Sequence, residues 1–427
     1  AYLPRQEIDS GVVTIEIVEA SFGGASVQGT QPQRIAASRL VEMAEANLRK
    51  GQALHANDLD RTLLILDDLP GVSVAGNLVE GQRDGETELA LTALDDALIN
   101  GNISVDNQGA RSTGSDRLYV SLNFNSPFGF GDGLALNGLK TQGTDYQRLS
   151  YTVPVGNYGL RAGLHASKLN YRVITDDFAS LNPSGVASTR GWDISYPLLR
   201  SQLQNVNVAL SYDDKKFDNT SNSSTTSYAI KIYNASLSAN QIDSWAGGGA
   251  TNGNITLSAG EKNTESVYTK LSLSLSRLQS LNESLSFYAA ANAQASNRNL
   301  DSSEKMYLGG STGVRAFPAS EAGGSEGKTL TLELRQRLDN NINLTGFYDY
   351  GRIKVNHDNS IASPANPNDY VLQGYGISVA WQAAQGLEFK ATLAQRLGIN
   401  PAAQASGNDG DGTKKMTRVW LSTGISF

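Results

Sequence analysis

Apolar and polar residues alternate strictly along most of the chain after about residue 101. The clearest run is Leu271–Ser276, in which leucine and serine alternate without interruption. The same period of two recurs in Leu118–Asn125, in Leu330–Arg335 and in the last residues, Val419–Phe427. Because successive side chains of a β-strand point to opposite faces, this pattern predicts strands with one apolar face and one polar face.

About sixteen such segments can be distinguished, and longer connectors tend to alternate with short ones. The segments lie near residues 100–110, 116–126, 132–141, 145–154, 158–172, 187–197, 202–214, 225–239, 251–260, 265–279, 283–298, 327–339, 342–354, 369–382, 386–397 and 417–427. The longer connectors are 173–186, 215–224, 299–326, 355–368 and 398–416, and the stretch 240–250 is an exception because a short connector is due there.

Long strands joined by short turns at one rim and longer loops at the other are typical of an outer-membrane β-barrel. A soluble β-sandwich or propeller also alternates, but it buries its apolar face and carries more charge outside. We therefore predict a mainly β chain with an antiparallel transmembrane barrel of about sixteen strands. Such a barrel is wide enough for an aqueous lumen unless a segment fills it.

The first 95 residues follow a different period and predict a small α+β unit. Short β-rich runs occur at Val12–Val18 and Ala25–Gly29. Helical spacing then begins at Pro32 and ends before Gly51. A second helix is expected from a cap at Asn57 or Asp58 to about Leu69. Two strands follow, near residues 72–79 and 88–94, which gives the order strand, helix, helix, strand, strand.

The amino-acid composition further restricts the class of protein. Of 427 residues, 39 % are apolar and 18 % charged, below the roughly 45–50 % and about 25 % that are usual in soluble proteins. No stretch approaches the ~20 consecutive apolar residues of a membrane helix, which excludes a helical membrane protein. The chain has no Cys and only three His, so we expect no metal site, no cofactor and no enzymatic activity.

Charge is distributed unevenly along the chain. Residues 1–100 carry 7 Lys and Arg against 16 Asp and Glu, whereas residues 101–427 carry 28 against 26. An acidic first segment followed by a nearly neutral remainder argues against a nucleic-acid partner, which requires a basic surface.

Two glycine-rich motifs were weighed as signs of catalysis or nucleotide binding. Gly309–Gly313 matches the G-x-S-x-G pattern of a hydrolase with Ser311 as nucleophile, but that chemistry needs a helix directly after the serine. Gly323–Thr329 approaches a phosphate-binding loop, yet Ala322 stands where a glycine is needed and a strand follows. An outer-membrane lipase remains the weakest alternative, and a phosphate site is rejected.

One constellation in the last third of the chain favours a function. The longest connector, 299–326, contains Val314, Arg315, Ala316 and Phe317, and the second strand after it contains Phe347, Asp349 and Gly351. The strand period places these last three on the lumen face. Arg315 is a candidate partner for the Asp349 carboxylate if the connector folds inward. From these residues alone, an unrelated surface arginine and lumen aspartate fit equally well.

Several motifs together carry a family resemblance that covers essentially the whole chain. They are Asp106-Asn107-x-Gly109 with Thr113-Gly114, Asn125-x-Pro127-Phe128-Gly129-x-Gly131-Asp132, Tyr151-x-x-Pro154-Val155-Gly156, Leu300–Lys305 leading through Leu308–Gly310 to Val314–Pro318, and Phe347-x-Asp349-x-Gly351. They resemble the outer-membrane transporters of two-partner secretion, which secrete filamentous haemagglutinins, haemolysins and contact-dependent toxins. The superfamily also contains the barrel-assembly machinery.

The resemblance implies a gating loop and its partner on the barrel wall. Val314, Arg315, Ala316 and Phe317 correspond to the loop motif, with Ala316 where the superfamily often has Gly. Phe347, Asp349 and Gly351 correspond to the wall motif. In the family the loop arginine meets the wall aspartate, which implies an Arg315–Asp349 contact here.

The resemblance also implies a domain order. Residues 1–20 are similar to the tail of a POTRA (polypeptide-transport-associated) domain whose remainder is missing, and residues 21–95 resemble a complete POTRA domain. Residues 96–427 correspond to the barrel, with the connector 299–326 folded inward. We expect an outer-membrane location with the POTRA domain in the periplasm.

The implied function is export of an unfolded exoprotein through the barrel lumen without nucleotide hydrolysis. The expected partners are a large secreted exoprotein (a β-helical adhesin, haemolysin or toxin) and outer-membrane lipids, and the barrel is expected to be monomeric. Two alternatives stay open: an assembly factor that inserts other barrels, and a passive porin.

Overall fold

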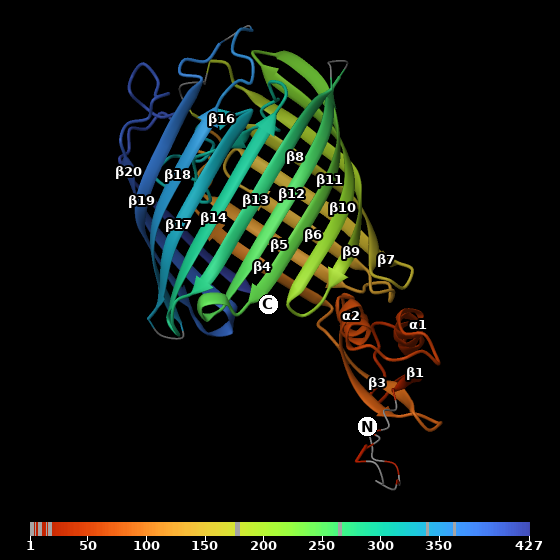
Figure 1. Ribbon diagram of the computed structural model, residues 1–427. Coiled ribbons are helices and arrows are strands. Elements are labelled where there is room, and N and C mark those ends of the chain that lie inside the picture. The colour runs from red at the N-terminus through yellow and green to blue at the C-terminus, as the bar shows by residue number, and fades with distance from the viewer. Residues whose placement is uncertain are drawn as a thin grey trace.

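The computed structural model describes residues 19–175, 180–263, 267–338, 341–361 and 364–427, and residues 4, 6, 11–13 and 15 before them. A barrel of long, tilted strands stands above a smaller unit of helices and strands (Figure 1). Of the strand expected within Val12–Val18, residues 12, 13 and 15 are described and are not in a strand, and the others lie outside the described residues. No helix in the described ranges is long and apolar enough to cross a membrane.

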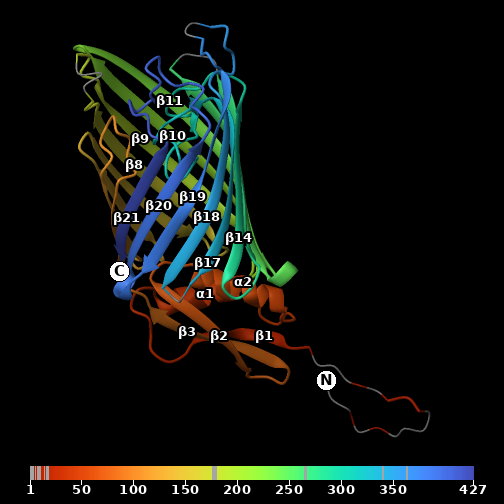
Figure 2. The ribbon, with the colours of Figure 1, turned by 90° about the vertical axis from the view of Figure 1, so that its left-hand side faces the viewer.

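The smaller unit, here called the N-terminal unit (residues 21–95), has the order of elements that the sequence predicts. Its elements are β1 (Ser21–Val27), α1 (Ala37–Asn47), α2 (Ala56–Asp67), β2 (Val72–Glu80) and β3 (Glu86–Asp95). Strand β3 is central, parallel to β1 and antiparallel to β2. Both helices pack on one face of this sheet (Figure 2), and side chains from all five elements form the core.

Both helices begin at other residues than the sequence predicts. The first helix begins at Ala37 and not at Pro32, because the backbone N–H groups of Gln33 and Arg34 donate to the Asp95 carboxylate at the end of β3. These bonds hold the chain in a bend before the helix. The second helix begins at Ala56 with His55 at the N-cap, so the predicted caps at Asn57 and Asp58 are wrong.

All sixteen predicted segments are strands of one closed antiparallel barrel. They are β4 (Ile99–Asp106), β5 (Arg117–Asn125), β6 (Gly133–Lys140), β7 (Thr144–Val155), β8 (Leu160–Arg172), β9 (Ser184–Arg200), β10 (Gln204–Ser221), β11 (Ser224–Asp243), β12 (Gly249–Lys262), β13 (Tyr268–Ser280), β14 (Leu285–Ser296), β17 (Glu326–Arg337), β18 (Ile342–Lys354), β19 (Asp369–Gln382), β20 (Leu387–Leu397) and β21 (Thr417–Ser426). Two 3-10 turns, η2 (Trp245–Gly247) and η3 (Ala384–Gly386), join neighbouring strands.

The alternating apolar and polar residues of the sequence lie on the outer and inner faces of the barrel wall, respectively. Leu237, Ile255 and Leu273 lie side by side on three adjacent strands, and all three are exposed on the outside of the barrel. The polar residues between them point inward. An apolar belt outside and a polar lumen inside is the arrangement that lipid requires of a closed barrel.

Two connectors differ from the prediction. The expected long connector 215–224 is a tight turn at Asn222 and Ser223, both with positive φ, because β10 and β11 continue as a hairpin beyond the apolar belt. Backbone pairing in such a hairpin does not depend on an apolar face. The exceptional stretch 240–250 is largely strand as well, since β11 runs to Asp243 and only η2 separates it from β12.

The barrel closes between its first and last strands, β4 and β21. Five residue pairs form this seam in register, from Asn102–Ser426 to Asp106–Ser422, and Gly101 and Phe427 exchange two further backbone hydrogen bonds next to them. The Asn107 side chain extends the seam beyond β4. Its Oδ1 accepts from Leu421 N at 2.8 Å, and its Nδ2 donates to Val419 O at 3.1 Å.

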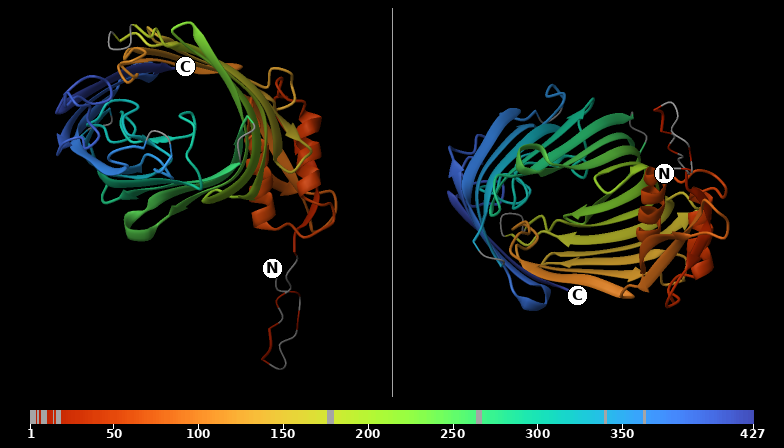
Figure 3. Two further views of the ribbon diagram at one scale, coloured as in Figure 1. Left: turned by 90° about the horizontal axis from the view of Figure 1, so that it is seen from above. Right: turned by 60° about the horizontal axis from the view of Figure 1, so that its bottom comes forward.

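The N-terminal unit is attached to one side of the barrel rim (Figure 3). Arg39 on α1 donates to the carbonyl oxygen of Gly156 at 2.7 Å, in the turn between β7 and β8. Arg200 at the end of β9 forms two hydrogen bonds of 2.8 Å with the Asp68 carboxylate after α2. The unit therefore sits beneath the strands around β7 and β9. We call this rim the near rim and the opposite one the far rim.

Candidate functional site: the loop inside the barrel

The segment between β14 and β17, residues 297–325, is here called the lumen loop. Its two arms pair as the short strands β15 (Met306–Tyr307) and β16 (Gly323–Gly324). Seen from above, this teal segment lies inside the ring of strands (Figure 3). The sequence-predicted residues Val314–Phe317 lie at its inner end and are buried.

Arg315 of the lumen loop forms a bidentate ion pair with Asp349 of β18. Its Nε and Nη2 atoms lie 2.8 and 2.7 Å from the two carboxylate oxygens, and its backbone N–H donates to Oδ2 at 3.1 Å. The Asp349 side chain is only 1 % exposed and that of Arg315 is 9 % exposed. The contact that the family resemblance implies is therefore present. Parallel N–H···O bonds of this kind fix geometry as well as charge.

A second carboxylate completes the cluster around Arg315. Glu333 of β17 accepts from Nη1 of Arg315 at 2.8 Å and from Nε of Arg335 at 2.8 Å. The Arg315 guanidinium also lies 3.5 Å from the ring centroid of Phe347. Arg315, Glu333, Arg335 and Asp349, here called the tip cluster, carry two positive and two negative charges. Such pairing compensates for the burial of the charges.

Small residues on the wall let the loop backbone approach closely. A Cβ atom added at Gly351 of β18 would lie 2.9 Å from Cγ2 of Val314, and one added at Gly374 of β19 would lie 2.5 Å from Cβ of Ala316. Ala316 is not among the residues with positive φ, so its position does not require the glycine that the superfamily often has. The missing side chain at Gly374 makes room for the Ala316 methyl group.

The far-rim connector between β20 and β21, residues 398–416, covers the outer part of the lumen loop. Asn400 Nδ2 and Gly410 N both donate at 2.8 Å to the buried carboxylate of Glu321. Burial raises the pKa of this carboxyl, and the two donors only partly oppose that rise. Beside it, Asp409 is fully buried and pairs with Arg396 and Arg418.

Phe317 is fully buried between these two segments. The guanidinium of Arg396 lies 4.3 Å from its ring centroid, and Phe317 belongs to an apolar cluster with Leu308 and Val314. The lumen loop thus packs against the wall through an apolar cluster as well as through ionic contacts.

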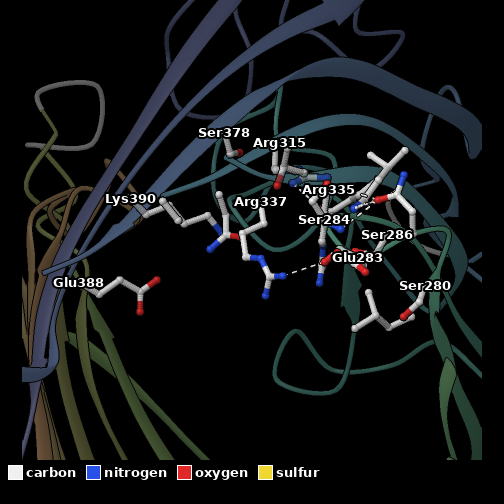
Figure 4. Close-up of a pocket in the computed structure, with 17 residues that line it drawn as sticks. Ser280, Glu283, Ser284, Ser286, Arg315, Arg335, Arg337, Ser378, Glu388 and Lys390 are labelled. Atoms are coloured by element: carbon white, nitrogen blue, oxygen red, sulfur yellow. Dashed lines mark hydrogen bonds and ion pairs between the residues drawn. The ribbon is translucent and has the colours of Figure 1, made fainter. Parts of the chain in front are cut away.

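A polar cavity of about 540 Å³ lies directly below the tip cluster (Figure 4). It is lined by residues of the near-rim turn between β13 and β14, such as Glu283 and Ser284, and by lumen-facing residues of β17 to β20. Arg335 and Arg337 point into it from one wall, and Lys390 and Glu388 face it from another. The cavity is an open, charged space on the near-rim side of the loop.

The structure brings the predicted loop and wall residues into one cluster. Phe347 and Asp349 contact Arg315, and Gly351 meets Val314. Sequence reasoning missed Glu333 and Trp420. Glu333 lies between lipid-facing leucines on β17, so its lumen orientation was readable from the alternation. Nothing in the local sequence indicates that Trp420 Nε1 donates to the Arg315 carbonyl oxygen.

The motifs weighed for chemistry do not form catalytic arrangements. Ser311 donates to Oε1 of Gln108 at 2.7 Å, and a turn, not a helix, follows it. Gly323 and Gly324 form β16 and lead directly into strand β17, which is not the strand-to-helix geometry of a phosphate site. Within the described residues, no group of three or more His, Cys, Asp or Glu side chains is arranged to hold a metal ion.

Comparison with known proteins agrees with the fold. The model of the family described as haemolysin secretion/activation protein ShlB/FhaC/HecB matches residues 85–380. The heme/hemopexin transporter protein HuxB of Haemophilus influenzae (strain 86-028NP) is 25 % identical over 421 residues, which cover 94 % of this chain and 74 % of that protein. The outer membrane transporter CdiB of Dickeya dadantii (strain 3937) is 23 % identical over 353 residues, covering 78 % of this chain and 62 % of that protein.

Among solved structures, CdiB from Escherichia coli superimposes with a TM-score of 0.81 at 19 % identity, covering 100 % of this chain and 80 % of that one. This likeness establishes the fold. Together with the family match over most of the barrel, it identifies the chain as a member of the haemolysin secretion/activation protein family ShlB/FhaC/HecB, the two-partner secretion transporters of the outer membrane.

Proposed function

We propose that this protein exports one large exoprotein, in an unfolded state, from the periplasm through its barrel lumen. The observation that carries the proposal is the lumen loop, whose tip is bound to the wall by the buried tip cluster. The loop is held by ion pairs and by close packing at Gly351 and Gly374, and a charged cavity lies beneath it. These contacts can break and re-form, so the loop can act as a gate that moves aside for a passing chain.

In this proposal the N-terminal unit is a POTRA domain in the periplasm, and residues 1–20 are the tail of a preceding one. The edge of β2, which pairs on one side only within its three-stranded sheet, offers backbone groups to an extended segment of the exoprotein. The barrel, residues 96–427, then forms the conduit. A single closed barrel is enough for this task, so we propose that the protein acts as a monomer.

In this mechanism the folding of the exoprotein outside the cell sets the direction of transport. No phosphate-binding loop occurs in the described part of the chain, and folding of the exoprotein into a β-rich adhesin, haemolysin or toxin outside the cell makes return unfavourable. The names of two relatives agree with a transport role, since HuxB is a heme/hemopexin transporter protein and CdiB an outer membrane transporter. The family description, haemolysin secretion/activation protein, favours a secreted protein over a small solute as the cargo.

The proposal is tested by removing the protein from its host and measuring all large proteins in the medium. We expect one exoprotein to disappear from the medium and to return when the intact chain is restored. Unchanged secretion together with loss of other outer-membrane barrels would instead identify an assembly factor. Unchanged secretion with reduced uptake of small solutes would identify a passive porin.

A further inference from the structure

The lumen loop contacts the barrel wall at a second place, remote from the tip cluster. The Glu304 carboxylate lies 2.7 Å from Nζ of Lys215 and 2.7 Å from Nζ of Lys270. Lys215 belongs to β10 and Lys270 to β13, which have β11 and β12 between them in the barrel. We call these three residues the stem cluster. The tip cluster is built on other strands, β17 and β18.

The chain around Glu304 is fixed by more than this ionic contact. Gln294 Nε2 donates to the Glu304 carbonyl oxygen at 3.2 Å, and Asp301 pairs with Lys262 at 3.1 Å. Leu300 packs in a buried cluster with Ile230 and its neighbours on the lumen face. The start of the lumen loop is therefore bound to the β10–β13 wall by both apolar and charged groups.

The electrostatics of the stem cluster make Glu304 its central residue. The Glu304 side chain is 3 % exposed. Burial acts to raise the pKa of this carboxyl, but the charges of Lys215 and Lys270 outweigh burial and lower it. Without the carboxylate, two ammonium groups would face each other across a largely closed space. Removing one partner of a buried ion pair is strongly destabilising for this reason.

The base of the loop is closed as well. Leu300 N donates to Ser325 Oγ at 3.0 Å, and Ser325 N donates to the carbonyl oxygen of Val355 at 3.0 Å. The two ends of the loop are thus joined to each other and to the end of β18. Glu304 is nearer along the chain to this base than Arg315 is, so a swing about the base displaces Arg315 more than Glu304.

We propose that Glu304 is a positioning residue: the stem cluster is a fixed pivot that stays bound to the β10–β13 wall while the tip cluster separates during export. This inference rests on the proposed function, because it divides the same gate into a fixed part, the stem cluster, and a moving part, the tip cluster. Nothing in the family resemblance or in the comparisons assigns a role to Lys215, Lys270 or Glu304.

The test uses paired cysteines, which the chain allows because it has none of its own. One variant carries Glu304→Cys with Lys270→Cys. The other carries Ser311→Cys with Gln108→Cys, which joins the loop tip to the wall where a 2.7 Å hydrogen bond now lies and leaves the tip cluster intact. A short bis-methanethiosulfonate reagent links each pair, and a reductant cleaves the link. We expect the stem link to leave export as it is in the reduced variant, and the tip link to stop export until the reductant is added.

Arrest of export by the stem link would overturn the pivot assignment and leave the gate itself standing. Normal export with the tip link in place would overturn the gate in the proposed function. The two failures are therefore distinguished by which of the two links has an effect.

A second measurement needs no exoprotein. Ion conductance of the purified barrel in planar bilayers is expected to rise several-fold in Glu304→Gln and further in Glu304→Lys. The exchange variant Glu304→Lys with Lys270→Glu keeps two positive charges and one negative charge, and we expect it to return conductance toward the wild-type value. An exchange variant that folds, as judged by heat-modifiable mobility, but conducts like Glu304→Lys would overturn the positioning role.

Discussion

Trp420 on the last strand donates a hydrogen bond of 2.8 Å from its indole Nε1 to the backbone carbonyl oxygen of Arg315. The side chain of the same arginine is bound to β17 and β18 on the other side of the loop tip. One residue of the lumen loop is thus held by three strands, through both its backbone and its guanidinium. Displacing the tip unpairs several buried polar groups at once, which explains how a loop inside a wet lumen keeps one position.

Loss of either partner of the central ion pair is expected to impair export. In Arg315→Ala or Asp349→Ala one buried charge loses its main partner, at a cost of about 3–5 kcal/mol. We expect export of the exoprotein to fall by about tenfold or more, and the double variant to be no worse than either single one, because the two residues act as a pair. Secreted protein is measured at equal abundance of barrel in the membrane.

The matched control is Arg352→Ala on the same strand. Arg352 pairs with Asp369 at 2.7 Å, but both side chains are largely exposed, and exposed pairs contribute only about 0–1 kcal/mol. Wild-type export in both tip variants, or an equal loss in Arg352→Ala, would contradict the role of the Arg315–Asp349 pair in gating.

Filling the space at Gly351 is expected to displace the lumen loop. A Cβ atom there would lie 2.9 Å from Val314 and 3.1 Å from Leu308, whereas one at Gly346 of the same strand would meet nothing within 4 Å. Overpacking of this kind costs roughly 1–3 kcal/mol. Gly351→Ala should therefore raise ion conductance and sensitivity to large antibiotics, and Gly346→Ala should change neither. Equal behaviour of the two variants would argue against close packing of the loop on β18.

Acid is expected to loosen the start of the lumen loop. The folded-state pKa of Glu304 is lowered from its ordinary value of 4.5, so its charge stabilises the closed loop fully above that value. This contribution is lost as the pH falls from about 4.5 through the lowered pKa. Conductance in planar bilayers should rise over that range in the wild type.

The Glu304→Gln variant should already conduct more at pH 7, with a weaker further rise on acidification. Other carboxyls near the loop, such as that of Asp411 in the connector 398–416, also have a lowered pKa. The difference between the two proteins, and not the wild-type curve alone, therefore measures Glu304. Parallel curves for wild type and variant would exclude Glu304 as the titrating group.

Truncation of Asn107 is expected to weaken the closing seam of the barrel. Its side chain replaces two backbone partners of β21 where β4 has ended, and a lost hydrogen bond that leaves a partner unpaired costs about 1–3 kcal/mol. Asn107→Ala should lower the temperature at which the barrel loses its heat-modifiable mobility. Asn123→Ala, which removes an exposed contact with Asn100, serves as the control and should leave that temperature unchanged.

The number and positions of the strands depend on neighbouring residues and could therefore be predicted from the sequence. Alternation in a run such as Leu271–Ser276 depends only on consecutive residues, so all sixteen strands can be located, and their ends agree within a few positions except at the far end of β10. The errors fell where pairing continued without the pattern, as at Asn222 and Ser223, or where a distant side chain bent the chain, as Asp95 does before α1.

The candidate site also has a part that could be predicted from the sequence and a part that could not. The loop and wall motifs pointed to Arg315 and Asp349 because the family resemblance joins two separate stretches of sequence. The stem cluster had no such signal, since Glu304 lies 89 residues from Lys215 and 34 from Lys270.

By itself, then, the sequence determined the two periods of the chain, the number of strands and which face of each strand meets lipid, because those follow from neighbouring residues. Only the tertiary structure decided which lumen-facing charges meet. Closing the barrel brings distant strands such as β10, β13 and β18 around one space, and a loop folded into that space contacts whichever of their side chains it can reach.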